Sequence, residues 1–295
     1  MKISGFSFIR NALKYDYPIK ECIDTLLNLC DEVVIVVGES EDETLSFIKS
    51  FKVERLKIIN SKWDTNLGYN LLSELTNLAI SNCTGQWGIY LQSDEIIHEK
   101  YYCTILEAVN ESNKNKEIEG LLFNYRHFYG SHRLYHSGRR FYKNEVRAIR
   151  LGIGIVSYGD AKGFRRNNRK LMVRRVNAEI YHYGWARNPE KMKNKTCNFH
   201  QLWHSEEDLK RIRQNEPGLY ESEKNFHLIP FEGDHPKVVH NWLKENEDWS
   251  NRNYMIWKNS LCELNLFDYF KKAEAFIERK TWFIGYNKPY RGLIY

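Results

Sequence analysis

Polar residues able to bind charged ligands directly follow three apolar segments in the first third of the sequence. These polar clusters are Arg10-Asn11, the acidic run 39–44, and Gln92-Ser93-Asp94-Glu95. Adjacent carboxylates such as Asp94 and Glu95 offer the oxygen ligands that Mg²⁺ and Mn²⁺ prefer, and such ions bind the phosphates of substrates. The competing interpretation is that Asp94 caps a helix that starts near Ile96, because acidic residues are favoured at helix starts.

A parallel α/β sheet would bring these three clusters together. Continuous apolar runs predict strands at 3–9, 32–37, 56–60 and 87–91, and helical spacing predicts helices at 19–30, 44–51 and 71–81. Strands that alternate with helices pair in parallel and form a doubly wound sheet. Ligands bind beyond the carboxyl ends of the strands in such a sheet, which is where all three clusters are predicted.

The second half of the chain changes character. Short strands are predicted at 121–128, 133–136, 146–149 and 153–157, followed by a basic, polar loop at 163–175 and a last strand at 178–185. Helical patterns come next, among them an amphipathic helix at 267–280. We therefore expect an α/β core over residues 1–188 and a mostly helical extension over 189–295 that packs on this core.

The positive charge of the chain is concentrated in one segment. The 295 residues carry 44 Lys and Arg against 38 Asp and Glu, a net charge of +6. Residues 126–175 hold 14 of these cations and only two acids, Glu145 and Asp160, so the rest of the chain is acidic. This basic segment predicts local anion binding. With its interleaved Tyr and Phe it also keeps nucleic-acid binding open as an alternative function.

Composition and targeting signals limit the class of protein. An apolar fraction of 42%, with only 6 prolines and 17 glycines, excludes a disordered or fibrous chain. No apolar run approaches the roughly 18 residues of a membrane span, and the N-terminus has no pattern of a secretion signal. Six scattered cysteines without a CxxC pair are typical of reduced thiols. We expect a cytoplasmic protein, with peripheral membrane contact left open.

The order of the motifs resembles an inverting glycosyltransferase of family 2 with the GT-A fold. The chain offers VVGESEDET for the base-binding acidic turn, TNLAI for the Asn-bearing helix, and GQWGIYLQSDE for the strand that ends in a metal-binding motif. Residues 147–150, 158–160 and 181–183 resemble the branch that builds lipopolysaccharide core and capsular glycans. The resemblance covers about residues 3–190. Two positions depart from the family pattern: Gln92 replaces the first Asp of the metal motif, and Gly38 replaces an Asp of the acidic turn.

The resemblance implies transfer of a sugar from a nucleoside-diphosphate sugar to a glycan or lipid-linked acceptor, with Mn²⁺ or Mg²⁺ as the cofactor. It places the metal at Asp94, Glu95 and His182, with Glu95 either stabilising the neighbouring turn or holding a metal-bound water. It gives the role of general base to Asp160, with Glu145 in reserve. The implied donor-binding residues are Phe8, Arg10, Asn11, Glu39, Asp42, Asn77, Arg187 and Lys193.

The basic segment has a specific meaning under this interpretation. Its cations would neutralise the departing diphosphate, or face an anionic acceptor or a membrane, and nucleic acid is then not an expected partner. The alternative to a catalytic role for a carboxylate such as Asp160 in this segment is a structural salt bridge. A sugar nucleotidyltransferase on a similar fold is disfavoured, because IRNALK rather than a Gly-rich phosphate loop follows the first strand.

Overall fold

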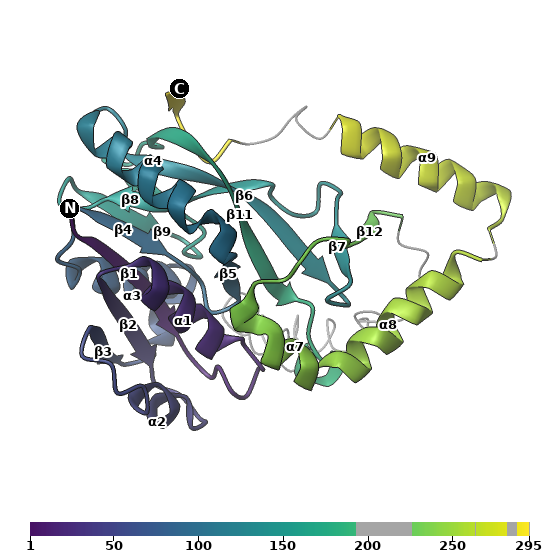
Figure 1. Cartoon of the computed structure of the whole chain (residues 1–295), viewed down its shortest axis with the longest axis horizontal. Helices are drawn as coiled ribbons and strands as arrows, with labels where there is room; N and C mark the ends of the chain where they lie inside the picture. The colour runs from purple at the N-terminus through teal and green to yellow at the C-terminus, as the bar shows by residue number, and fades with distance from the viewer. Residues whose placement is uncertain (193–225, 263, 282–287, 295) are drawn as a thin grey trace.

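A mixed β-sheet runs through the centre of the protein, with helices on both faces (Figure 1). The computed structural model describes residues 1–192, 226–262, 264–281 and 288–294. Within these residues the strands follow the order β12-β7-β6-β8-β4-β1-β2-β3, and β11 pairs with β6, β5 and β13. The strand bounds are β1 Ile3–Ile9, β2 Glu32–Gly38, β3 Leu56–Ser61, β4 Trp87–Tyr90, β5 Glu95–Ile97, β6 Gly120–Tyr129, β7 Leu134–His136, β8 Asn144–Arg150, β11 Met172–Trp185, β12 Leu228–Pro230 and β13 Gly292–Ile294, with β9 Ile155–Tyr158 and β10 Gly163–Arg166 as a separate hairpin.

The first four strands form the parallel half of the sheet, as predicted. β1 pairs in parallel with β2 and β4, and β2 pairs in parallel with β3. Successive side chains of β2 point to opposite faces, so Ile35 packs in one core cluster while Val34 and Val36 pack in another. The carboxyl ends of all four strands therefore lie at one edge, which confirms the predicted doubly wound arrangement.

Helices cover both faces of the sheet. α1 (Ile19–Leu29) and α4 (Tyr102–Lys114) contribute to the core cluster on one face, and α3 (Leu71–Ser81) contributes to the cluster on the other face. The apolar residues of α1 recur at helical spacing, so one stripe of the helix is buried. The other helical elements are α2 Thr44–Lys49, α7 His240–Glu245, α8 Glu247–Ser260, α9 Leu266–Lys280 and the 3₁₀ turns η1 Thr65–Asn70, η2 Glu99–Tyr101 and η3 Lys237–Val239.

The second half of the sheet introduces a reversed strand. β8 runs antiparallel to β4 and to β6, so its first residues lie beyond the carboxyl end of β4 and beside the middle of β6. β11 then pairs in parallel with β6. Because of this order, Glu145 at the start of β8 and His127 and His182 near the ends of β6 and β11 all reach the edge where the parallel strands end.

Residues 95–97 form the buried strand β5 and not the first turn of a helix. The helix-capping interpretation of Asp94 is therefore wrong. β5 pairs antiparallel with β11, which sets His182 opposite Glu95, and the Tyr183 N–H donates to the Asp94 carbonyl at 2.9 Å. The long strand β11 thus holds the residues that follow β4 in place.

The prediction of a loop over residues 163–175 is also wrong. The segment contains the strand β10 and the first residues of β11. Arg166 and Arg169 both form ion pairs with the buried Glu119, with nitrogen–oxygen distances of 2.8 and 2.6 Å. Burial alone would raise the pKa of Glu119, but hydrogen bonds from Arg169 and Arg166 lower this pKa to about 2. Basic residues that looked solvated in the sequence are thus neutralised by an acid from elsewhere in the chain.

The described part of the C-terminal region contacts the core at several places, among them the pairing of β13 with β11. Val239 and Trp242 join the same core cluster as α1, and β12 pairs with β7. The last two helices, α8 and α9, are mostly exposed. Their only buried residues are Ser250 in α8 and Asp268 and Ala275 in α9. Figure 1 shows α9 beyond α8 at the periphery of the molecule.

Candidate functional site

Asp94 lies at the carboxyl end of β4 in a set of charged and histidine side chains. Its carboxylate is 6% exposed, and its Oδ2 accepts a hydrogen bond from Arg187 Nη2 at 2.9 Å. Its Oδ1 lies 3.7 Å from His182 Nε2. Gly184 borders both groups: a Cβ atom at this position would lie 2.6 Å from Asp94 Oδ2 and from His182 Nε2. Asp94 and His182 therefore pack directly against the Gly184 backbone, an approach that a side chain at residue 184 would block.

Arg187 supports Asp94 from within the protein. The guanidinium is fully buried, donates to the Tyr15 carbonyl at 3.0 Å, and stacks 3.7 Å from the centre of the Tyr17 ring. We expected Arg187 to bind the donor directly, but the structure gives it Asp94 as its ionic partner. Its positive charge offsets the cost of burying the Asp94 carboxylate.

Glu95 belongs to a separate, fully buried network. Arg147 binds both of its carboxylate oxygens at 2.8 Å, and the Tyr125 hydroxyl donates to Oε1 at 2.7 Å. The backbone N–H of Gln92 donates to Oε2 at 3.1 Å, so Glu95 also closes the turn after β4. With these partners the carboxylate is committed to the protein, which favours the turn-stabilising role of Glu95 over the metal-binding one.

Hydrogen bonds around His127 determine which nitrogen of His182 carries the hydrogen and which carries the lone pair. His127 Nε2 lies 2.7 Å from the Tyr142 carbonyl, which can only accept, so this nitrogen carries a hydrogen. Burial, with the nearby His182, lowers the pKa of His127 well below its ordinary value, so the ring is neutral and its Nδ1 is an acceptor. His182 Nδ1, 3.0 Å away, is then the donor. In a neutral His182 ring the remaining lone pair is on Nε2, directed toward Asp94.

Among the described residues no group of three or more His, Cys, Asp and Glu side chains could hold a metal ion. Asp94 and His182 nevertheless bring a carboxylate oxygen and an imidazole nitrogen within 3.7 Å of each other, and Gly184 permits this close approach. Two protein ligands suit a metal whose other positions belong to water and substrate phosphates. The expected set of Asp94, Glu95 and His182 thus reduces to the pair Asp94 and His182.

Two carboxyl groups near this edge are candidate proton acceptors. Glu145 is 5% exposed, and its burial raises its pKa to about 7. Asp160 is half-buried in the turn between β9 and β10, where its Oδ1 accepts from the Lys162 N–H at 3.3 Å. Within the described residues Asp160 forms no ion pair with a cation, which removes the main support for a structural salt bridge at this residue.

The carboxyl ends of β1 and β2 carry an aromatic and cationic surface. The Arg10 guanidinium stacks 4.4 Å from the centre of the Trp63 ring and donates to the Glu39 carbonyl at 2.8 Å. A Cβ atom on Gly38 would lie 3.0 Å from Trp63 Cε3. Gly38 is therefore explained by the Trp63 ring, which occupies the space that a side chain would need. Sequence patterns missed Trp63 because it follows β3 in an irregular segment without a motif.

Besides Arg10, four of the expected donor-binding residues lie at this edge, but only some face outward. Glu39 is exposed, and Phe8 is partly buried on β1. Asp42 accepts hydrogen bonds from the Lys14 and Thr44 N–H groups at 2.7 and 3.1 Å, so it joins the loop after β1 to the start of α2. Asn11 is buried with φ 49°, and its Oδ1 accepts from the Glu41 N–H at 2.8 Å.

Of the other expected donor-binding residues, Asn77 has partners elsewhere. Asn77 exchanges two hydrogen bonds with the Ser157 backbone, at 2.7 and 3.2 Å, and so ties α3 to β9. A side chain with both amide groups bound in this way has a structural role. Lys193 lies outside the described residues.

Part of the positive charge of the basic segment 126–175 is balanced by acids from elsewhere in the chain. Five of its arginines pair with acids, and every one of these acids lies outside the segment. The pairs are Arg126–Glu179, Arg147–Glu95, Arg166–Glu119, Arg169–Glu119 and Arg174–Glu111. Nucleic-acid binding needs cations available to the phosphates. This dispersal therefore disfavours the nucleic-acid alternative.

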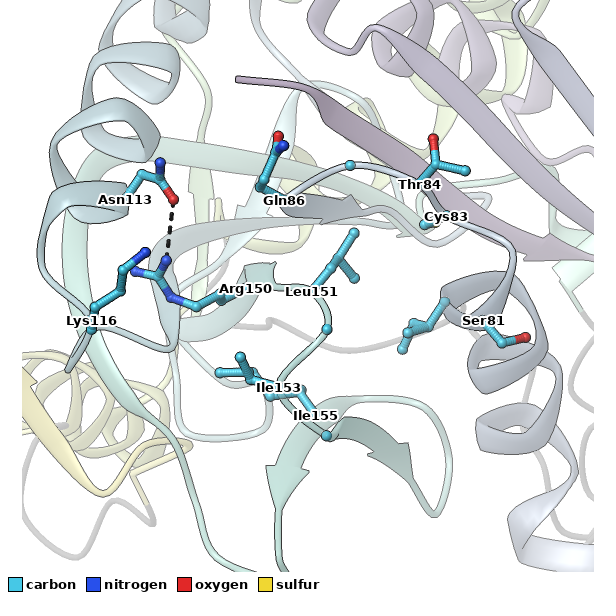
Figure 2. Close-up of a pocket in the computed structure, with 14 residues that line it drawn as sticks. Ser81, Cys83, Thr84, Gln86, Asn113, Lys116, Arg150, Leu151, Ile153 and Ile155 are labelled. Atoms are coloured by element: carbon cyan, nitrogen blue, oxygen red, sulfur yellow. Dashed lines mark hydrogen bonds between the residues drawn. The ribbon is translucent and has the colours of Figure 1, made fainter.

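A cavity of about 620 Å³ lies at the opposite edge of the sheet, between the start of β4 and the end of β8 (Figure 2). Its lining includes Gln86, Arg150 and Leu151. The Arg150 guanidinium there is bound to the carbonyls of Ser112 and Ile118 at 2.7 and 3.0 Å. This cation is therefore occupied by the backbone, and the cavity is separate from the Asp94 edge.

Comparison with known proteins identifies the family. The family model of glycosyl transferase family 2 matches residues 15–171, which is more than half of the 295 residues. The chain belongs to this glycosyltransferase family, and its curled, mostly parallel sheet flanked by helices is the GT-A fold. The expected family and fold class are both confirmed. No curated protein matches the sequence.

Solved structures with a similar course of the chain include two bacterial proteins. Staphylococcus aureus TarS 1-349 is 17% identical, covers 72% of this chain and 69% of its own, and has a TM-score of 0.40. The same TarS fragment in complex with UDP-GlcNAc is 14% identical over 72% and 70%, with a TM-score of 0.38. Mycobacterium tuberculosis glucosyl-3-phosphoglycerate synthase, in complex with Mn²⁺, UDP and glucosyl-3-phosphoglycerate, is 16% identical over 42% and 44%, with a TM-score of 0.31.

Proposed function

We propose that this glycosyltransferase moves a hexosyl group from a nucleoside-diphosphate sugar to a hydroxyl of a glycan or lipid-linked acceptor, with inversion at the anomeric carbon. The observation that carries the proposal is the convergence of Asp94, His182 and Gly184 at the carboxyl edge of a GT-A sheet. The proposed acceptors are those of bacterial polysaccharide synthesis, and the protein would reach them from the cytoplasmic side. Residues 1–188 would carry the chemistry, and residues 189–295 would be the extension.

Asp94 and His182 would hold a Mn²⁺ or Mg²⁺ ion together with the donor phosphates. When bound, such an ion supplies positive charge that stabilises the departing diphosphate. Arg187 would hold the Asp94 carboxylate in its orientation, and His127 would keep the lone pair of His182 directed toward this carboxylate. Asp94 alone replaces the usual acidic pair, because Gln92 offers no carboxylate and Glu95 is bound by Arg147.

The surface formed by Arg10, Trp63 and Glu39 would hold the nucleoside of the donor. The Trp63 ring and the Arg10 guanidinium form a flat stack whose outer face suits a nucleobase. Glu39 is exposed beside this stack and can accept hydrogen bonds from a base or ribose. Phe8 and Asn11 would support this surface from beneath.

Asp160 would act as the general base. The acceptor oxygen attacks the anomeric carbon from the side opposite the diphosphate, and the new carbon–oxygen bond forms as the bond to the phosphate oxygen breaks. The diphosphate leaves with the electron pair, and the acceptor proton passes to the Asp160 carboxylate. Glu145 is the alternative acceptor of this proton, because its pKa of about 7 suits a base near neutral pH.

Nucleotide binding tests the proposal directly. Thermal unfolding would be followed with UDP, GDP, CMP and single-stranded RNA, each with and without Mn²⁺. We expect one diphosphate to raise the Tm in a Mn²⁺-dependent way, and a panel of nucleotide sugars would then show which donor is slowly hydrolysed. Stabilisation by RNA alone would contradict the proposal.

A side chain at residue 184 should weaken metal binding by Asp94 and His182. In Gly184→Ala the new methyl group meets Asp94 Oδ2 and His182 Nε2 at 2.6 Å, so at least one of these groups must move. We expect Mn²⁺ affinity, measured by calorimetry in the presence of the nucleotide, to fall at least about tenfold.

The matched control is Gly163→Ala, where the nearest atom to the new Cβ is 3.5 Å away and the contact is ordinary. This control should bind Mn²⁺ like the wild type. Equal Mn²⁺ affinity in the two variants would show that the ion does not occupy the space next to Gly184.

A further inference from the structure

Helix α9 carries a large apolar face that no described part of the protein covers. The exposed fractions of its side chains include 76% for Leu266, 67% for Phe270 and 59% for Ile277. Tyr269 and Phe276 on the same helix are 58% and 52% exposed. Scattered exposed apolar residues are normal on a protein surface, but six large ones on one four-turn helix, with Phe267 64% exposed, form a continuous surface.

The spacing of these residues places them on the side of α9 that points away from the protein. Leu266, Phe270, Ala273 and Ile277 recur at intervals of four, three and four residues and so share one stripe. At 100° per residue, the buried Ala275 lies on the opposite side of the helix from this stripe. Arg139 holds that inner side, because its side chain donates to the Thr281 carbonyl at 3.1 Å.

The charges of α9 indicate what this face contacts. The exposed charged side chains of the helix are Lys271, Lys272 and Lys280 against a single acid, Glu274. Glu278, on the inner flank, lies 3.7 Å from His227 and is engaged with the protein. An apolar stripe with aromatic residues and an excess of lysines at its borders is typical of helices that lie in the interface of an anionic membrane.

Lys280 argues against a second copy of the chain as the occupant. Its position on the helix falls within the arc between Phe276 and Ile277, so a protein partner would bury its ammonium group. A lipid surface imposes no such cost, because the lysine extends its ammonium group to the phosphates while its stem stays apolar.

We propose that α9 attaches the protein to an anionic lipid surface, with Leu266, Phe270 and Ile277 inserted among the headgroups. The helix lies on the membrane and does not cross it: among the described residues no helix has the length and hydropathy of a transmembrane span. This surface is independent of the Asp94 site, so the inference does not rest on the proposed sugar transfer. The sequence alone suggested membrane contact by the basic segment, whereas the structure assigns this contact to α9.

Vesicle flotation tests the assignment with the full chain. The probes are vesicles of phosphatidylcholine alone and of phosphatidylcholine with an equal amount of phosphatidylglycerol. We expect the wild type to float with the anionic vesicles, less so at raised salt, and the double variant Phe270→Asp, Ile277→Asp to bind at least about tenfold more weakly. Its thermal unfolding should match that of the wild type, because both side chains are exposed.

The matched control is Leu106→Asp, which places the same charge on a 39% exposed leucine of α4. It should float like the wild type. Wild-type protein that stays out of the anionic vesicles would overturn the proposal. Light scattering that shows a dimer dispersed by Phe270→Asp, Ile277→Asp would assign the face to a second copy instead.

Discussion

Replacement of Asp160 by asparagine is expected to lower kcat by about 10²–10⁴-fold while leaving donor binding unchanged. The amide has the shape of the carboxylate and can keep the hydrogen bond from the Lys162 N–H, but it cannot take a proton from the acceptor hydroxyl. The rate should be measured with the donor identified by the hydrolysis panel, and nucleotide affinity by calorimetry. An Asp160→Asn enzyme with near wild-type turnover would transfer the role to Glu145.

Glu145→Gln is the matched control, because Glu145 is the other acid of the basic segment. If Asp160 is the base, this variant should retain most of its activity. If Glu145 is the base, turnover of the wild type should rise as pH increases through about 7, and Glu145→Gln should lose both the activity and this dependence.

The stability of the same variant provides a readout separate from catalysis. Burial raises the pKa of Glu145 to about 7 in the folded protein, whereas the unfolded chain ionises near the ordinary value of 4.5. Between these values the folded state holds the proton more tightly, so the free energy of unfolding decreases as pH rises. Thermal unfolding of Glu145→Gln should lack this decrease.

The largest effect on stability is expected at the ion pair of Glu95 and Arg147. Both side chains are fully buried, and the guanidinium binds both carboxylate oxygens. Arg147→Met removes the cation and leaves Glu95 buried with only the Tyr125 hydroxyl and a backbone N–H. We expect a loss of about 3–5 kcal/mol in the free energy of unfolding, measured by urea denaturation.

A double-mutant cycle separates this loss from a simple packing defect. The double variant Glu95→Leu, Arg147→Met removes both charges while keeping apolar volume, so it should recover much of the stability that Arg147→Met loses. A double variant less stable than Arg147→Met would mean that the volume and shape of the pair, and not its charges, account for the loss.

Hydrophobic patterning was sufficient to predict the parallel half of the sheet. The β-branched run at 33–37 and the apolar segment at 87–90 are buried on both faces, and such strands carry a continuous signal along the sequence. The position of Asp94 at a carboxyl edge followed from the alternation of strands and helices alone. Strand β10 was missed because its basic residues are typical of a solvated loop, whereas in the structure Arg166 binds Glu119, 47 residues away.

The partners within the site could not be predicted, because they depend on pairing between distant strands. His127 and His182 meet only because β6 and β11 are parallel neighbours, and no local pattern relates the two residues. Trp63 reaches Gly38 through the pairing of β2 with β3. Family resemblance supplied Asp94 and His182 as candidates, but their support by Arg187 and Gly184 appears only when the strands are assembled.

Charge shows the same division between sequence and structure. The sequence by itself determined that residues 126–175 carry 14 cations and two acids within a chain whose remainder is acidic. Only the tertiary structure decided what this excess does: it distributes the arginines among Glu95, Glu111, Glu119 and Glu179. The physical reason is that a buried or half-buried charge requires a counter-charge in space, and proximity in space is set by strand pairing and not by distance along the chain.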